Sequence, residues 1–192
     1  MTQGKAFTNP ANDQSTDITH GQALKKTGFW GKRGAGAIVM AKTTGKLLLP
    51  YRSLYVLQPH TWGVWGGAID PKEKPEDAVK REMKEEVGYR GLDIDLIPLY
   101  VFEDEKTGFR YHNFLAVVPD EFTPDLNWET DNFKWVEFGD WPTPLHFGLK
   151  ALIKNSGGTI KRIVEKNKAR EQLSESDGNP FIVRRKFWNP SH

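Results

Sequence analysis

The chain has 192 residues, of which 38% are hydrophobic, and a formal net charge of +2, which together predict one domain with a hydrophobic core and room for extensions. It contains no cysteine, which excludes disulfide bonds, thiol nucleophiles and cysteine-ligated metal centres and is compatible with a reducing compartment.

The N-terminal region is polar. Residues 1–27 are rich in Thr, Asn, Gln, Asp and Gly, and this composition predicts an arm without stable structure. They lack the apolar segment of a secretory signal, and nowhere does an apolar run approach the roughly 20 residues that span a bilayer. We therefore expect a cytoplasmic protein that does not enter the membrane.

An ordered domain is expected over residues 28–155. Residues 35–41 are typical of a buried strand, residues 43–46 of a turn, and residues 47–53 of a second strand, so this stretch predicts a β-hairpin. Residues 58–70 contain many Gly and turn formers, and we expect regular structure only at their end.

A helix is predicted from Pro75 to Val87. Proline fits the first turn of a helix, and Gly88 is a typical terminator. Val79, Met83 and Val87 recur at every fourth position and predict a buried stripe.

Three more strands and two more helices are predicted in the second half. The strands are residues 96–104, 109–118 and 133–138. The helices are residues 144–155 and 159–173, separated by Gly157–Gly158, and residues 181–188 are expected to form a terminal strand. This order of elements predicts a layered mixed α/β fold rather than a βαβ repeat.

Three glutamates on the predicted helix, Glu82, Glu85 and Glu86, fall within an arc of about 100° beside the buried stripe. Like charges at this spacing repel one another, and more strongly when they are partly buried. Two interpretations remain open on the helix pattern alone. Either a hard divalent cation lies among the carboxylates, or the helix presents an acidic surface balanced by its lysines.

The wider spacing favours the first interpretation. Residues 67–89, called the box below, fit the pattern G-x5-E-x7-R-E-U-x-E-E-x-G-U, where U is a bulky aliphatic residue. The residues that fill it are Gly67, Glu73, Arg81, Glu82, Met83, Glu85, Glu86 and Gly88. This stretch resembles the signature of the Nudix hydrolases. Tyr89 replaces the last aliphatic residue, and Trp65 stands where the family often has proline.

The resemblance covers residues 28–155 and leaves residues 156–192 outside as a basic helical extension. It implies an α/β fold, a Nudix-type α/β/α sandwich with a mixed sheet and the box helix on one face. It also implies an enzyme that hydrolyses a nucleoside diphosphate linked to another group and needs Mg²⁺ or Mn²⁺. The residues matching the metal-binding positions are Glu82, Glu85 and Glu86, with Gly67 letting the backbone pass close to the metal.

Catalytic roles also follow from the resemblance. Glu82 matches the residue that orients or deprotonates water, and Arg81 matches the arginine that supports the box by pairing with Glu73 or Glu85. Many members add a carboxylate outside the box, for which Glu129 is the first choice because it precedes a strand. Its rivals at a strand end are Glu103, Asp104 and Glu105.

Substrate-binding candidates lie outside the box. Arg52 is similar to the arginine that faces the substrate phosphates, a task for which its bidentate fork is suited, although a solvated strand-end arginine has the same pattern. Aromatic side chains can stack on a base or fill the core. Those considered are Trp62, Trp65, Tyr100, Phe102 and Tyr111.

Two functions are therefore carried forward. The first is hydrolysis of a small nucleotide, such as an oxidised nucleoside triphosphate or an ADP-ribose-like compound. The alternative is a non-catalytic nucleotide- or RNA-binding module. Residues 159–192 hold eight Lys/Arg against four acidic residues, which predicts either a solvated helix face or a contact with RNA. Paired subunits are frequent in the family, so a homodimer is a candidate assembly.

Overall fold

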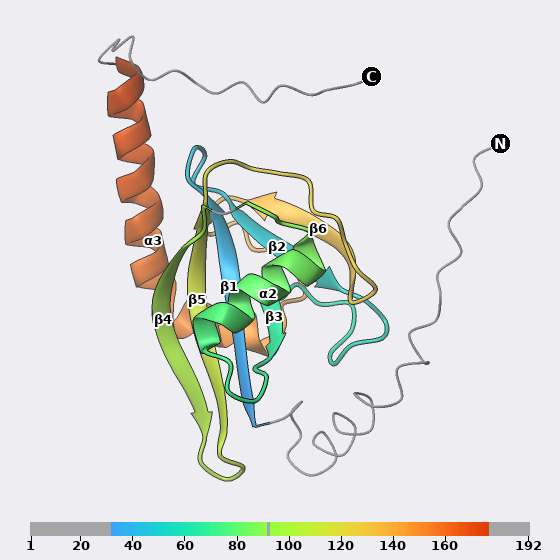
Figure 1. The fold of residues 1–192 in the computed structure, drawn as a ribbon. Helices are drawn as coiled ribbons and strands as arrows, with labels where there is room; N and C mark the ends of the chain where they lie inside the picture. The colour runs from blue at the N-terminus through green and yellow to red at the C-terminus, as the bar shows by residue number, and fades with distance from the viewer. Residues whose placement is uncertain (1–31, 92, 177–192) are drawn as a thin grey trace, which may run out of the picture.

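The computed structural model describes residues 32–91 and 93–176. They form a mixed six-stranded sheet with one helix packed on each face, which is the predicted α/β/α sandwich (Figure 1). The arm predicted at residues 1–27 and the strand predicted at residues 181–188 lie outside the described residues.

The elements follow one another as β1 (Arg33–Ala41), β2 (Leu47–Arg52), β3 (Trp65–Ala68), α2 (Pro75–Val87), β4 (Asp95–Asp104), β5 (Phe109–Val118), β6 (Thr130–Val136) and α3 (Phe147–Ser176). The strand order in the sheet is β4-β5-β1-β2-β6, and the short β3 pairs with the first half of β1. The predicted hairpin and the strands around residues 96–104 and 109–118 are confirmed. The predicted strand at residues 133–138 begins and ends earlier, at Thr130 and Val136.

The centre of the sheet is β1, which pairs in parallel with β5 and antiparallel with β2 and β3. Eight of its nine residues are buried, because both of its faces are covered. Side chains of a strand alternate between the two faces, so β1 sends Ala35, Ala37 and Val39 toward α2 and Ile38 and Met40 toward α3. The core therefore has two halves separated by the sheet.

The box helix agrees with its prediction at both ends. Pro75 begins α2, and Gly88 follows it with a φ of 66°, a left-handed conformation that glycine adopts without strain. Val79 and Met83 are buried against the sheet. The burial of this apolar stripe fixes which way the neighbouring glutamates face.

The prediction of two C-terminal helices separated by Gly157–Gly158 is wrong, because α3 runs unbroken from Phe147 to Ser176. Leu149 and Ile160, on opposite sides of the glycine pair, both lie in the core half beneath α3. Glycine in a helix costs about 1 kcal/mol relative to alanine. Burying this long apolar stripe outweighs that cost, so the helix continues.

The basic residues of α3 are partly neutralised within the chain. Lys168 pairs with Glu137, and Nζ of Lys161 lies 3.8 Å from Oε1 of Glu165. The contact with RNA stays a prediction. Across the part of the chain that the structure describes, neither helix combines the length and apolar character needed to cross a membrane.

Candidate active site

Strand β3 and helix α2 approach each other closely just before the start of the box. The backbone N–H of Gly66 donates to Oε2 of Glu86 at 2.8 Å, and the Glu86 side chain is only 6% exposed. Gly66 has a φ of 141°, and a Cβ there would overlap the backbone of Ala35 and Gly36 on β1. The sheet therefore holds one of the predicted metal-binding carboxylates inside the protein.

Gly67 leaves room for a second carboxylate. A Cβ at this position would lie 2.6 Å from Oε1 of Glu82, so only glycine lets Glu82 approach the backbone this closely. The Glu82 side chain is 12% exposed. By contrast, the side chain of Glu85, the third glutamate, is 56% exposed.

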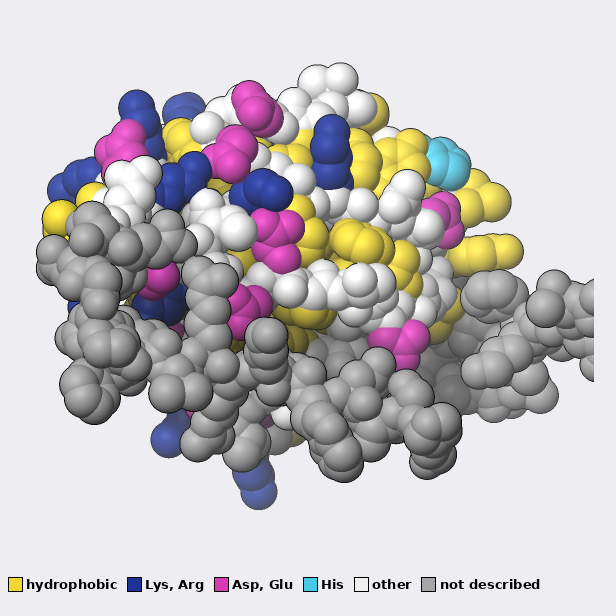
Figure 2. Space-filling view, turned by 90° about the horizontal axis from the view of Figure 1, so that it is seen from above, with side chains coloured by type: hydrophobic (Ala, Val, Ile, Leu, Met, Phe, Trp, Pro, Cys, Tyr) yellow, Lys and Arg dark blue, Asp and Glu magenta, His cyan; other side chains and the backbone are white. Residues whose placement is uncertain are grey.

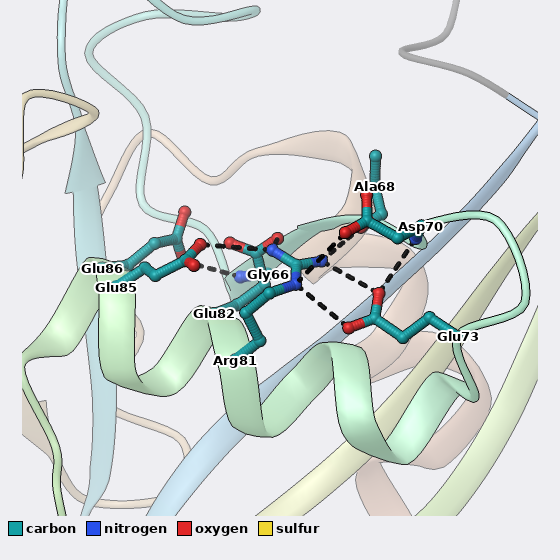
Figure 3. A network of polar contacts seen from close by, with 8 residues as sticks. All are labelled: Gly66, Ala68, Asp70, Glu73, Arg81, Glu82, Glu85 and Glu86. Carbon is teal, nitrogen blue, oxygen red and sulfur yellow. Dashed lines mark hydrogen bonds and ion pairs between the residues drawn. The ribbon is translucent and has the colours of Figure 1, made fainter. Parts of the chain in front are cut away.

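Arg81 joins the two ends of the box (Figure 3). Its Nε and Nη2 donate to Glu73 at 3.0 and 3.1 Å, and Nη2 also donates to the Ala68 carbonyl at 2.8 Å. Its Nη1 donates to Glu82 at 2.7 Å and to Glu85 at 3.2 Å. Both predicted carboxylate partners of Arg81 are therefore present, and Glu82 is a third.

The bidentate Arg81–Glu73 pair is expected to stabilise the box. A double-mutant cycle with Arg81→Ala and Glu73→Ala, measured by urea unfolding, should give a coupling free energy of about 1–2 kcal/mol. The matched control is Arg110–Glu103, which has a similar 2.8 Å contact but side chains 57% and 48% exposed. Its coupling should be below about 0.5 kcal/mol, because solvent screens exposed pairs. Equal coupling free energies for the two pairs would contradict a stabilising role of the Arg81–Glu73 pair in the box.

Burial raises the pKa of both inner glutamates. Burial raises the pKa of Glu86 well above its ordinary value, and the negative charges of Glu129 and Glu82 raise it further. Burial also raises the pKa of Glu82 to about 7; Arg81 opposes this shift, while Glu129 adds to it. Glu129 therefore lies within electrostatic range of both box carboxylates.

Arg52 faces the same group of acids from the end of β2. Burial lowers the pKa of its guanidinium, and the nearby Tyr111, Glu86 and Glu129 oppose that shift. Its Nε donates to the Leu57 carbonyl at 2.9 Å. Arg52 therefore lies within electrostatic range of Glu86 and Glu129, and its role in facing substrate phosphates stays a prediction.

Tyr111 lies against β1 beside this cluster. A Cβ at Gly34 would lie 2.6 Å from Cδ2 of Tyr111, and one at Gly36 would overlap its hydroxyl. The two glycines therefore let the ring pack close to the strand. Burial raises the pKa of Tyr111, and the negative charge of Glu86 contributes to the shift.

His146 is a member of this neighbourhood that sequence reasoning did not single out. Burial lowers its pKa to about 4, and the positive charge of Arg52 contributes. Its Nδ1 accepts the N–H of Gly148 at 3.0 Å, so the neutral ring caps the first turn of α3. The signal in the sequence is a residue with a side-chain acceptor directly before a helix.

The base-stacking role predicted for Trp65 is wrong. Trp65 is 1% exposed in the core beneath α2, and its indole Nε1 donates to the Leu48 carbonyl at 3.1 Å. Trp62 is half-buried, with its ring 5.0 Å from that of Tyr51. Tyr111 is the aromatic candidate with a described electrostatic link to Arg52, Glu82 and Glu86. These three residues and Glu129 are called the charged cluster below.

The remaining candidates lie on or near the β4–β5 hairpin. Glu103 pairs with Arg110 at 2.8 Å, and Asp104 accepts the hydroxyl of Thr107 at 2.6 Å, which gives both a local structural role. Tyr100 and Phe102 are half-buried on β4. Glu105 is exposed in the turn between β4 and β5. The carboxylate outside the box stays a prediction for Glu129, which lies within electrostatic range of Glu82 and Glu86.

The donor set suits a hard divalent cation in type. Carboxylate oxygens are the ligands that Mg²⁺ and Mn²⁺ prefer, and the space at Gly67 is one that a Cβ would fill. Among the residues placed by the structure, no three acidic or histidine side chains already converge as an ion site. Arg81 instead draws Glu82 and Glu85 toward itself.

Comparison with known proteins connects this geometry with a family. The family model described as NUDIX domain matches residues 31–155. A Mycobacterium tuberculosis protein named as a candidate 8-oxo-dGTP diphosphatase is 30% identical over 138 residues, covering 64% of this chain and 61% of that protein. The match thus spans less than two thirds of this relative's length.

Solved structures agree in fold. The crystal structure of RenU, a Nudix hydrolase from M. smegmatis, has a TM-score of 0.64 and 26% identity, covering 70% of this chain and 89% of that one. A MutT NUDIX hydrolase from Burkholderia pseudomallei has a TM-score of 0.52 and 24% identity, covering 65% and 96%.

Proposed function

Because the chain belongs to the Nudix family, we propose that it is a divalent-metal-dependent pyrophosphohydrolase that cleaves a nucleoside diphosphate linked to another group. The observation that carries the proposal is that Glu129 lies within electrostatic range of Glu82 and Glu86, and that Arg52 lies within range of Glu86 and Glu129. Buried carboxylates of raised pKa are a common feature of catalytic sites.

A pyrophosphate would be repelled by these carboxylates alone, so the proposal includes Mg²⁺ or Mn²⁺. Glu82, Glu85 and Glu86 would hold the ion, and the absent side chain of Gly67 would leave space beside it. When bound, such an ion neutralises phosphate charge and lowers the pKa of water. Arg52 would bind phosphate oxygens with the guanidinium nitrogens other than Nε, which is engaged by Leu57.

Glu129 is proposed to accept the proton of the attacking water. It lies outside the proposed ligand set but within electrostatic range of Glu82 and Glu86, which suits a base acting on water beside the phosphates. Glu82, with its pKa of about 7, is the second candidate for this role. The geometry needed is a reach of about 3 Å to the water in the substrate complex.

Glu129→Gln is expected to lower kcat by about 100-fold or more, because the amide cannot accept the proton. The Mg²⁺ concentration for half-maximal activity and the thermal midpoint should stay close to those of the wild type. Glu105→Gln, at the exposed turn of the β4–β5 hairpin, is the matched control and should retain full activity. If Glu105→Gln lowered kcat and Glu129→Gln did not, the role of proton acceptor would pass from Glu129 to Glu105.

The substrate is proposed to be a small nucleotide, and the relationship to a candidate 8-oxo-dGTP diphosphatase makes oxidised purine nucleoside triphosphates the first choice. The test is a hydrolysis screen with and without Mg²⁺ over 8-oxo-dGTP, dNTPs, ADP-ribose, NADH, dinucleoside polyphosphates and 5′-triphosphate RNA. Product identification shows which phosphoanhydride bond is cleaved. Absence of Mg²⁺-dependent turnover across the panel would overturn the proposal.

A further inference from the structure

Large hydrophobic side chains are exposed next to the charged cluster. We call them the apolar rim; their exposed fractions range from 37% to 75%, and they are Leu54, Tyr55, Leu57, Trp128 and Phe147. Figure 1 shows the β2–β3 loop, which carries three of them, projecting from the sheet, and Figure 2 shows hydrophobic side chains protruding on the same side. Exposed apolar groups gathered in this way are typical of a binding surface.

The rim borders the proposed phosphate-binding residues at two points. The backbone N–H of Ser53 donates to the Glu129 carbonyl at 2.8 Å, which joins the start of the β2–β3 loop to the segment before β6. Arg52 and Leu54 flank Ser53, while Trp128 precedes Glu129. Since consecutive Cα atoms are about 3.8 Å apart, the rim begins within a few ångströms of both charged residues.

The rim is also held in place. The Arg52 Nε–Leu57 hydrogen bond ties the middle of the loop to the strand, and the backbone N–H of His60 donates to the Arg52 carbonyl at 2.9 Å. Gln58 and His60 adopt positive φ angles of 51° and 58°, which persist only where surrounding contacts enforce them. The Gln58 side chain accepts the N–H of Phe147 at 3.3 Å, which joins the loop to α3.

We propose that the apolar rim binds the nucleobase of the substrate, with the base stacked on Tyr55 and Trp128. The inference rests on the proposed hydrolase function and deepens it, since the same site would hold phosphates at Arg52 and the box. Tyr and Trp provide the planar faces on which any base stacks. The substrate class is then a nucleoside phosphate, whereas an inorganic polyphosphate would engage only the charged part of the site.

The test compares ligands with and without a base. Tyr55→Ala and Trp128→Ala are each expected to raise KM for the best nucleoside triphosphate about 10-fold, in the range of base stacking on one aromatic residue, while kcat stays within about 2-fold. The inhibition constant of inorganic triphosphate should not change. Tyr55→Phe keeps the aromatic face and should restore most of the nucleotide affinity that Tyr55→Ala loses.

Val101→Ala is the matched control, because Val101 is 50% exposed on β4, outside the rim. It should leave KM unchanged. Unchanged KM in both rim variants, with normal wild-type turnover, would contradict base binding by the rim. The hydrolase proposal would not be affected. An equal weakening of nucleotide and inorganic triphosphate would also contradict base binding by the rim, because it would show a structural effect.

Calorimetry separates this inference from the proposed function. The full chain is titrated with a non-hydrolysable analogue of the nucleoside triphosphate and with inorganic triphosphate in the presence of Mg²⁺, for the wild type and the rim variants. Selective loss of nucleotide affinity in the variants supports the rim even if no substrate is turned over. Equal affinity of the wild-type chain for both ligands would contradict it.

Discussion

Glu86→Gln is expected to reduce Mg²⁺-dependent turnover by about 100-fold or more, with the metal-free protein becoming more stable than the wild type. Glutamine keeps an oxygen that can accept the N–H of Gly66, so the contact between β3 and α2 is preserved. It lacks the charge that a divalent cation would neutralise, and the proposed ligand set loses a donor. Initial rates across a Mg²⁺ titration measure the first effect.

The stability gain follows from the raised pKa of Glu86. A carboxyl whose folded-state pKa lies above its unfolded value stabilises the protein below the unfolded pKa, and this contribution is lost as pH rises through the folded pKa. At pH 8 without metal, the substitution should therefore increase the free energy of unfolding by about 1–3 kcal/mol. The difference should shrink toward pH 4, where the carboxyl is protonated in both states.

Glu76→Gln, at an exposed position in the first turn of the same helix, is the control for both measurements. It should leave turnover unchanged and stability nearly so. If Glu86→Gln destabilised the metal-free protein at pH 8, the carboxylate would be serving mainly as a structural acceptor. Retained turnover would remove Glu86 from the proposed ligand set.

Gly67→Ala is expected to give a folded protein with turnover lowered by about 100-fold. The new methyl group would lie 2.6 Å from Oε1 and 3.0 Å from Cδ of Glu82, so the carboxylate at the end of a flexible side chain must move away. A displacement of about 1 Å in a catalytic group can lower activity 100-fold. Because a side chain rather than the backbone yields, the thermal midpoint should fall by only a few degrees.

The neighbouring substitution Gly66→Ala should have the opposite profile. Its Cβ would overlap backbone atoms of Ala35 and Gly36, and the φ of 141° is strained for any residue with a side chain. Neither strand can yield without breaking the β1–β3 pairing, so we expect a loss of about 3 kcal/mol or more, or failure to fold. Thermal unfolding and activity of the two variants together check the pair, and a fully active Gly67→Ala protein would contradict the role of the space at Gly67.

The box helix could be predicted to the residue because its signals are local. Proline at its start, glycine after its end and the spacing of Val79, Met83 and Val87 all depend on the nearest turns of chain. The same spacing correctly places Glu82 and Glu86 beside the buried stripe. Glu85, at the far side of the predicted arc, is exposed.

The features that could not be predicted depend on tertiary structure. Successive side chains of β3 point to opposite faces of the sheet. Only the pairing of β3 with β1 decides that the Trp65 ring points into the core. The exposure of Tyr55 and Trp128 likewise follows from how two segments distant in the sequence meet at Ser53 and Glu129. Tyr55 and Trp128 lie outside the helices and strands, so no periodic sequence pattern could predict that they are exposed.

The unbroken course of α3 bears on how the chain can be shortened. The family match ends at residue 155, yet Ile160 and Val164 are fully or almost fully buried in the same core half as Leu149. A truncation at residue 155 would therefore uncover part of one face of the sheet, although it would keep every residue of the box. In this chain the residues matched by the family model and the residues that form the core have different ends, because the core extends into α3 as far as Val164.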